Sequence, residues 1–182
     1  MAERSGDDLA LAFTRATLGL ALVHHQTAAE RDRGHKLLAE ISEVLYNLCD
    51  LPIVEVYLAR ERARRGDRDE AIPLMRSAVD HLVREGQLLG WGIPATGVLV
   101  ETLLDRGADG DVVEAEAAIA RLADAPADDG LVTREIWLLR LHALLARARG
   151  DEADYRDYRE RYRAMAKSLG FEGHMKWAEA MP

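Results

Sequence analysis

The sequence predicts an all-α fold in which pairs of antiparallel helices stack side by side into a superhelix, or solenoid. Three observations support this prediction: the composition, a turn signal that recurs about every 40 residues, and apolar residues at helical spacing. The 182 residues are enough for one domain with its own core. Hydrophobic residues make up 48% of the chain, charged residues 31% and aromatic residues 5%, a balance that favours helices and argues against disorder.

The recurring turn signal is a glycine followed by an aspartate, with an acidic residue three positions after that aspartate. It occurs at Gly66-Asp67, Gly110-Asp111 and Gly150-Asp151. Thr27 with Glu30 repeats the chemistry without the glycine. Glycine ends a helix because it adopts positive φ at little cost, and the Asp or Thr side chain then accepts hydrogen bonds from the free N–H groups of the next helix. The signal therefore predicts a helix, a tight turn and a second helix in each repeat.

Apolar periodicity places helices on both sides of these turns. The predicted helices span about 8–25, 28–48, 52–65, 68–86, 93–106, 112–124, 131–149 and 152–169, with a short ninth helix at 172–181. Pro52 and Pro94 fall in the first turns of their helices, where a missing N–H costs little. We expect a single domain over residues 1–182, built from pairs at 8–48, 52–86, 93–124 and 131–169.

Small residues at the predicted contacts between paired helices match a tetratricopeptide-like pattern, in which they let two helices approach closely. Ala59, Ala71 and Ala78 hold such places in the second pair, and Gly19 and Gly34 hold them in the first. The spacing of 40 to 44 residues exceeds the standard repeat of about 34, so these repeats are long. The pattern predicts a TPR-like α-α superhelix of about four long helix pairs, but it gives no information about a ligand.

Three tyrosines share one face of the last long helix. Tyr155, Tyr158 and Tyr162 lie at i, i+3 and i+7, the spacing of side chains that pack together against a neighbouring helix. We expect them to pack in the core against the preceding helix. A surface on which nucleotide bases stack is the alternative.

Two stretches of the chain carry a resemblance to a known family. Residues 95–104 (ATGVLVETLL) and 162–174 (YRAMAKSLGFEGH) resemble the C-terminal helical region of actinobacterial adenylate/guanylate cyclase–STAND ATPase regulators. In that family a nucleotide cyclase domain precedes an ATPase, and a tetratricopeptide-like array closes the chain. The resemblance implies a sensor or scaffold region. The chain has neither a GxxxxGK[ST] phosphate loop nor the spaced aspartates of a cyclase metal site, so no catalytic residue carries over.

The sequence also argues against several other functions. The net charge of −8 disfavours binding to nucleic acid or to an anionic membrane surface. Cys49 is the only cysteine, which excludes an intrachain disulfide and a cysteine-rich zinc site. The histidines match no metal-binding spacing, and no nucleophile elbow is present. We therefore expect a cytoplasmic chain that is not an enzyme and that uses no metal or cofactor.

The predicted partner-binding surface is the concave face of the array, which the first helix of each pair lines. By the repeat alignment its lining includes Phe13, Leu20, His24, Ile53, Val56, Arg60, Arg64, Glu101, Trp137, Arg140, Leu144 and Arg147. The last four members form one helical stripe at i, i+3, i+7 and i+10. Trp and Arg are enriched at binding hot spots, and guanidinium groups pair with carboxylates. We expect Arg60, Arg64 and this stripe to receive an apolar segment that bears carboxylates. A tryptophan packed between helices, beside solvated arginines, is the alternative.

The sequence therefore predicts a non-catalytic protein–protein interaction or regulatory module whose partner is a protein or peptide. Self-association into a homodimer stays open. A small-molecule effector domain, with the concave groove closed into a pocket, is the alternative function. The C-terminal segment 171–181 is expected to cap the last helix pair. It could instead exchange with a second copy or mask an interface.

Overall fold

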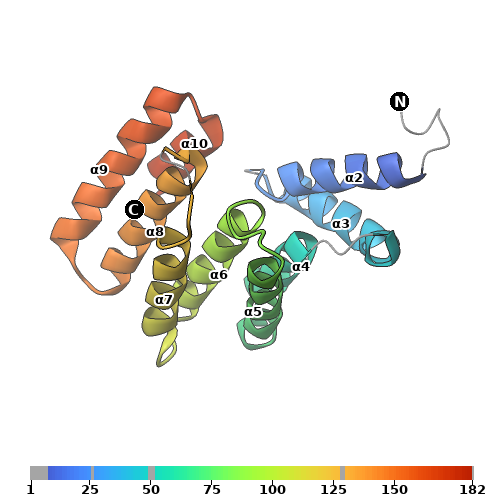
Figure 1. Cartoon of the computed structure of the whole chain (residues 1–182), viewed down its shortest axis with the longest axis horizontal. Helices are drawn as coiled ribbons and strands as arrows, with labels where there is room; N and C mark the ends of the chain where they lie inside the picture. Colours follow the sequence, from blue (N-terminus) through green and yellow to red (C-terminus); the bar gives the residue numbers. More distant parts are fainter. Residues whose placement is uncertain (1–7, 26, 49–51, 128–129, 182) are drawn as a thin grey trace. The chain divides into compact units, whose positions relative to one another are not determined.

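The computed structural model describes residues 8–25, 27–48, 52–127 and 130–181 (Figure 1). Within these residues the chain forms nine α-helices and no β-strand. The helices are α2 (Asp8–Leu22), α3 (Ala28–Leu48), α4 (Pro52–Arg64), α5 (Arg68–Arg84), α6 (Gly92–Arg106), α7 (Asp111–Ala123), α8 (Val132–Ala148), α9 (Glu152–Leu169) and α10 (Glu172–Ala180). The all-α prediction is confirmed, and every helix boundary lies within three residues of its predicted position. Cys49 lies outside the described residues.

The chain divides into two compact units, Met1–His81 and Leu82–Pro182, with the boundary inside α5. The prediction of a single domain over the whole chain stays a prediction. In the first unit α2 packs along α3, and α3 also contacts α4. Gly19 and Gly34 face each other where α2 meets α3. A Cβ atom on Gly34 would lie 2.9 Å from the carbonyl oxygen of Gly19. The predicted close approach of this pair is therefore confirmed.

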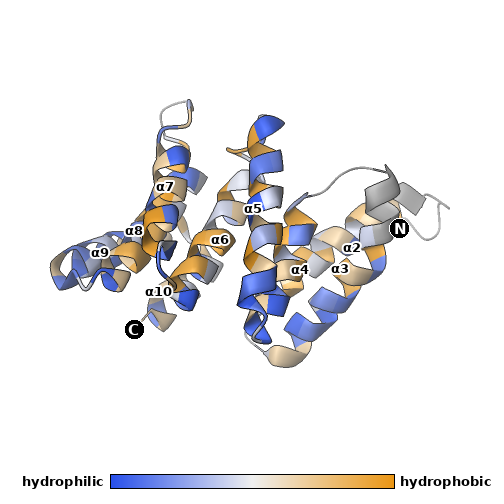
Figure 2. Ribbon diagram, turned by 90° about the horizontal axis from the view of Figure 1, so that it is seen from below, coloured by the Kyte–Doolittle hydropathy of each residue, from blue (hydrophilic) through white to orange (hydrophobic). Residues whose placement is uncertain are grey.

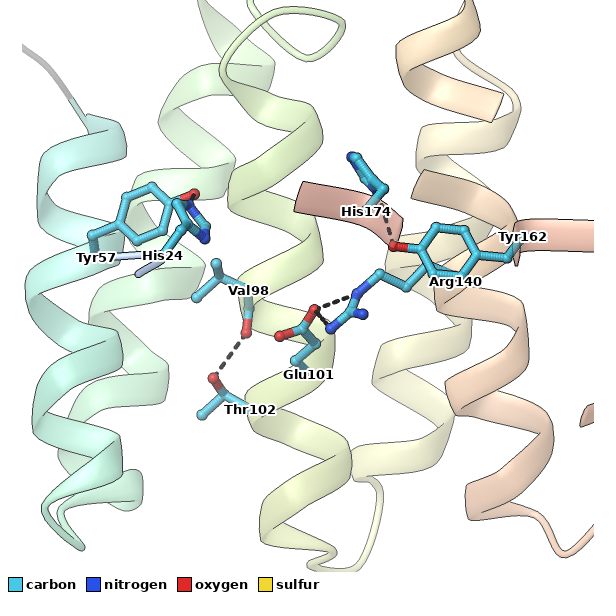
Figure 3. A network of polar contacts seen from close by, with 8 residues as sticks. All are labelled: His24, Tyr57, Val98, Glu101, Thr102, Arg140, Tyr162 and His174. Carbon is cyan, nitrogen blue, oxygen red and sulfur yellow. Dashed lines mark hydrogen bonds and ion pairs between the residues drawn. The ribbon is translucent and has the colours of Figure 1, made fainter. Parts of the chain in front are cut away.

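Part of the predicted groove lining is buried in the first unit. Ile53 and Val56 are 1% and 0% exposed, so they belong to the core and line no groove. The prediction was wrong for these two residues because helical spacing alone does not say which apolar face turns inward. His24 is half-buried, and its Nε2 atom lies 2.7 Å from the hydroxyl of Tyr57 (Figure 3).

In the second unit α6 is the central helix. It packs against α7 and α8, and α8 contacts α7 and α9. Ten of the fifteen residues of α6 are buried, and its ribbon is hydrophobic over much of its length (Figure 2). The short helix α10 packs on α9 (Figure 1). Tyr155 and Tyr162 are buried, and Tyr158 stacks on His142 of α8, so the predicted packing of the tyrosine face is confirmed.

The structure confirms the predicted backbone conformation of the turn glycines and one of the predicted helix caps. Gly66, Gly110 and Gly150 all have positive φ, as predicted. Asp151 caps α9, because its side chain accepts hydrogen bonds from the N–H groups of Ala153 and Asp154.

Asp111 departs from the predicted role of a helix cap. Gly110 holds the N-cap position of α7, and Asp111 is the first residue of the helix and 2% exposed. Its carboxylate accepts hydrogen bonds from the Arg106 guanidinium and from the Ala108 N–H, at 2.7 to 3.0 Å. The cap prediction was wrong here because the charged side chain of Arg106 competes for the carboxylate.

Candidate functional site

The candidate site is an open pocket on the second unit, between α6 and α8. Its volume is about 480 Å³, and its lining consists of Glu101, Leu104, Asp105, Arg140, Leu144, Arg147 and Ala148. Three of the four residues of the predicted stripe, Arg140, Leu144 and Arg147, therefore lie in one lining. Glu101, which the alignment also placed on the groove, joins them from α6. Helical spacing explains the agreement, because i, i+4 and i+7 side chains share one face of α8.

An ion pair forms one wall of this pocket. The Arg140 Nη2 and Nε atoms lie 2.8 and 2.9 Å from Glu101 Oε1 (Figure 3). The two side chains are only 12% and 16% exposed. Burial acts against the charge of Arg140, but the Glu101 carboxylate and the hydroxyl of Tyr162 outweigh it and raise the pKa of Arg140 above its usual value. The ion pair therefore joins α6 to α8.

Arg147 is the second arginine of the pocket lining. Its side chain is exposed, and among the described residues it makes no hydrogen bond or ion pair. Leu104, Leu144 and Ala148 supply apolar surface beside it. The pocket thus combines the Arg147 guanidinium with apolar side chains, the Asp105 carboxylate and the ion pair of Arg140 with Glu101.

Trp137, the first residue of the stripe, lies elsewhere. It is 6% exposed and packs between helices, as the alternative for this residue held. Its indole makes edge contacts with His174 and Trp177 of α10, at ring-centroid distances of 5.7 and 5.6 Å. On the α6 side it lies against Gly97, where a Cβ atom would come within 2.1 Å of the ring. In this structure Trp137 is therefore covered, and it does not line the pocket.

Arg140 also reaches α10. Its guanidinium lies over the ring of Trp177, 4.9 Å from the centroid, an arrangement in which the cation is attracted to the face of the indole. Arg140 thus lines the pocket and also contacts Trp177 of α10. The prediction that segment 171–181 caps the last helix pair did not include this contact with Arg140, although the i, i+3 spacing of His174 and Trp177 indicates that they share a helix face.

A buried hydrogen bond connects α9 to α10 beside this cluster. The Tyr162 hydroxyl lies 2.9 Å from His174 Nδ1 (Figure 3). Burial raises the pKa of Tyr162 to about 12, so the hydroxyl keeps its proton. The Arg140 guanidinium acts in the opposite direction on the pKa of Tyr162, but its effect is smaller than that of burial. Burial, with a smaller contribution from Arg140, lowers the pKa of His174 to about 4. His174 is therefore neutral near pH 7, and its Nδ1 atom shares a hydrogen bond with the Tyr162 hydroxyl.

Arg60 and Arg64, the remaining predicted site residues, lie on α4 in the first unit. Arg60 is half-buried and Arg64 is exposed. The Arg64 Nη1 atom lies 3.8 Å from the carboxylate of Glu61 on the same helix. Their predicted participation in the same binding surface as the α8 stripe stays a prediction.

In the described part of the chain, no cluster of three or more His, Cys, Asp or Glu side chains has an arrangement that could hold a metal ion. Nor does any helix within those residues have the length and apolar character needed to cross a membrane. Comparisons of the chain with protein-family models, with curated proteins and with solved structures find no match.

The lowered pKa of His174 predicts a pH dependence of stability. In the unfolded chain His174 has its usual pKa of 6.5 and is protonated below that pH. In the folded chain it is protonated only near pH 4. The unfolded state therefore binds more protons, and stability falls as the pH decreases from 6.5 towards 4. Because His174 is partly exposed, the effect is smaller than the full pKa shift implies. We expect the free energy of unfolding of the wild type to fall by about 1 kcal/mol more than that of His174→Gln between pH 7 and pH 5.

Urea unfolding at the two pH values, followed by circular dichroism, measures this difference. The other histidines are common to both chains, so their contributions cancel in the comparison. Equal losses in the two chains would show that His174 is protonated as easily in the folded state as in the unfolded state.

Proposed function

We propose that the chain is a non-catalytic, cytoplasmic interaction module with a TPR-like architecture, and that the pocket between α6 and α8 binds a protein segment. The observation that carries the proposal is the convergence of Arg147, Leu144 and Leu104 on one open pocket. An acidic side chain of the partner would pair with Arg147, and an apolar side chain next to it would cover the two leucines.

The contacts of the second unit support the TPR-like part of the proposal. The helix α8 packs against both members of the preceding pair, α6 and α7, and then pairs with α9. In repeat proteins each helix pair contacts its neighbours in this way, and the first helices of successive pairs line the surface that binds partners. The pocket lies between two such helices, α6 and α8.

The family resemblance of residues 95–104 and 162–174 supports a more specific role. On that basis we propose that the module serves as the sensor or scaffold region of a cyclase–ATPase signalling regulator. It would act by differential binding, since a partner that favours one arrangement of the linked domains shifts their equilibrium by its difference in affinity.

The test of the pocket is a charge reversal. Acidic peptides that bind the full chain are first selected from a displayed random library, and their affinities are then measured by isothermal titration calorimetry. We expect Arg147→Glu to weaken binding by about ten-fold or more, since it replaces an attractive contact by a repulsive one. The matched control is Arg163→Glu, which makes the same change at an exposed position of α9.

An additional variant, Leu144→Asp, tests the apolar part of the lining and should weaken the same peptides. If Arg147→Glu and Arg163→Glu reduce affinity equally, the effect is a general one of net charge, and the pocket is not the binding site. The salt dependence of binding should also fall in the Arg147→Glu chain.

The pocket volume favours a second candidate function. At about 480 Å³ the pocket is within the range of small-molecule sites, which extends from roughly 300 to 1,000 Å³. A small-molecule effector would raise the melting temperature of the isolated chain without any protein partner. A thermal-shift screen of metabolites against the wild type and Arg147→Glu separates the two functions.

A further inference from the structure

The helix α10 has the features of a docked ligand. Its buried or half-buried residues are His174, Met175, Trp177 and Ala178, and Met181, which follows the helix, is also buried. His174, Trp177, Ala178 and Met181 lie at i, i+3, i+4 and i+7. This is the spacing with which an amphipathic helix lies in a groove of a partner protein. The opposite face, which includes Glu172, Lys176 and Glu179, is exposed.

The surface beneath α10 is well defined. We call it the α10 cradle, and it consists of Trp137, Arg140, Arg159 and Tyr162. Trp137 and Arg140 contact the indole of Trp177, and the Tyr162 hydroxyl pairs with His174. Arg159 Nη2 donates a hydrogen bond of 2.9 Å to the carbonyl oxygen of Met181 at the end of the helix. The cradle thus combines an aromatic floor with two polar contacts that fix the position of a helix.

The attachment of α10 depends on the cradle. A helix of nine residues is shorter than the 12 to 15 or so residues at which isolated helices become even marginally stable in water. When α10 leaves, the polar groups of the cradle lose their hydrogen-bond partners. Water replaces these partners at low cost, because the hydroxyl and the guanidinium are then exposed. Undocking would therefore unfold α10 itself and leave the fold of α6 to α9 in place.

Undocking of α10 would also restore the stripe that the sequence predicts. Trp137 and the Trp177-facing side of Arg140 would become accessible, next to Leu144 and Arg147, which already line the pocket. The whole of the stripe along α8 would then face a partner. In the present structure the half of the stripe nearest α10 is covered by the chain's own Trp177.

We propose that the α10 cradle is a docking site for a partner's amphipathic helix, and that α10 occupies this site in competition with the partner. The partner helix would carry a tryptophan at the place of Trp177 and a hydrogen-bonding side chain three residues before it, at the place of His174. The proposal goes beyond the binding of an acidic peptide in the pocket, and it shares with it only the view that the chain binds protein segments.

The experiment uses a fluorescent peptide with the sequence of residues 170–181 as the probe. Its anisotropy is measured with the full-length wild type and with full-length Trp177→Ala. Since bound α10 blocks the cradle, the apparent affinity is reduced by the fraction of chains in which the cradle is free. We expect the peptide to bind Trp177→Ala at least about ten-fold more tightly than the wild type.

A probe peptide in which the tryptophan is replaced by alanine should bind neither chain. As a control on the protein, Arg163→Glu in the Trp177→Ala chain changes an exposed α9 residue outside the cradle and should leave the affinity unchanged. Equal affinity of the probe for wild type and Trp177→Ala, or no binding to either, overturns the proposal. The probe differs from the acidic peptides of the pocket test, so the two proposals fail independently.

Hydrogen exchange of the wild type provides a second measurement that needs no variant. We expect the amides of Met175–Ala180 to exchange at least about 100-fold faster than those at the centre of α8, because α10 opens without unfolding the rest. Equal protection of the two helices would show that α10 is part of the cooperative core, and it would overturn the proposal even if Trp177→Ala failed to fold.

Discussion

Replacing Gly97 by alanine is expected to lower the free energy of unfolding by about 3 kcal/mol. A Cβ atom at this position would lie 2.1 and 2.6 Å from Cζ3 and Cε3 of Trp137, far inside van der Waals contact. The indole cannot move away cheaply, because Trp177 and His174 hold its other side and only 6% of Trp137 is exposed. The new methyl group therefore forces a shift of α6 against α8. Chemical denaturation followed by tryptophan fluorescence and circular dichroism measures the loss.

Gly173 provides the matched control for this substitution. It also lies within a helix, α10, but no atom lies within 4 Å of its Cβ position. We expect Gly173→Ala to raise stability by up to about 1 kcal/mol, because alanine restricts the unfolded chain and favours the helix. A Gly97→Ala chain as stable as the wild type would mean that Trp137 does not pack against α6 as described. Trp137 would then not form part of the α10 cradle.

Neutralising Glu101 is expected to produce the second-largest effect, a loss of about 2 kcal/mol for Glu101→Gln. The amide keeps the shape of the side chain but removes the charge that compensates Arg140, whose side chain is 12% exposed. A buried guanidinium without a counter-charge is costly, whereas the intact pair contributes little by itself. We expect the loss to appear in urea unfolding at pH 7, with the m-value unchanged.

The control is an ion pair of similar length on the surface. In α9 the Arg161 Nη1 atom lies 3.1 Å from Asp157 Oδ2, and the two side chains are 58% and 63% exposed. Asp157→Asn should change stability by less than about 0.5 kcal/mol, since solvent and salt screen an exposed pair. If the two substitutions had equal effects, Arg140 would not depend on Glu101, and the junction of α6 with α8 would rest on apolar packing alone.

Much of the fold was predictable from local sequence. Positive φ at Gly66, Gly110 and Gly150 and the cap at Asp151 follow from chemistry within a few residues, and so do the helix boundaries. Asp111 was the exception because a competing partner, Arg106, also lies nearby but on the other side of the turn. Local rules state which groups can satisfy a free N–H, but they do not rank a charged competitor.

The candidate site was likewise predictable only in part. Periodicity placed Arg140, Leu144 and Arg147 on one face of α8, and the structure brings all three into the pocket lining. It also placed Trp137 on that face. The prediction that Trp137 lines a groove depended on its neighbours, and those are Gly97 and α10, each some 40 residues away in the sequence.

What the sequence by itself determined, then, is which residues form helices, where the turns fall and which side chains share a face of α8. These properties depend on backbone hydrogen bonds and on a repeat of 3.6 residues, both of which are local. Only the tertiary structure decided that Glu101 neutralises Arg140, that Trp137 is covered and that α10 is the segment covering it. Contacts between distant residues depend on the shape and burial of whole surfaces, and no spacing along the chain encodes them.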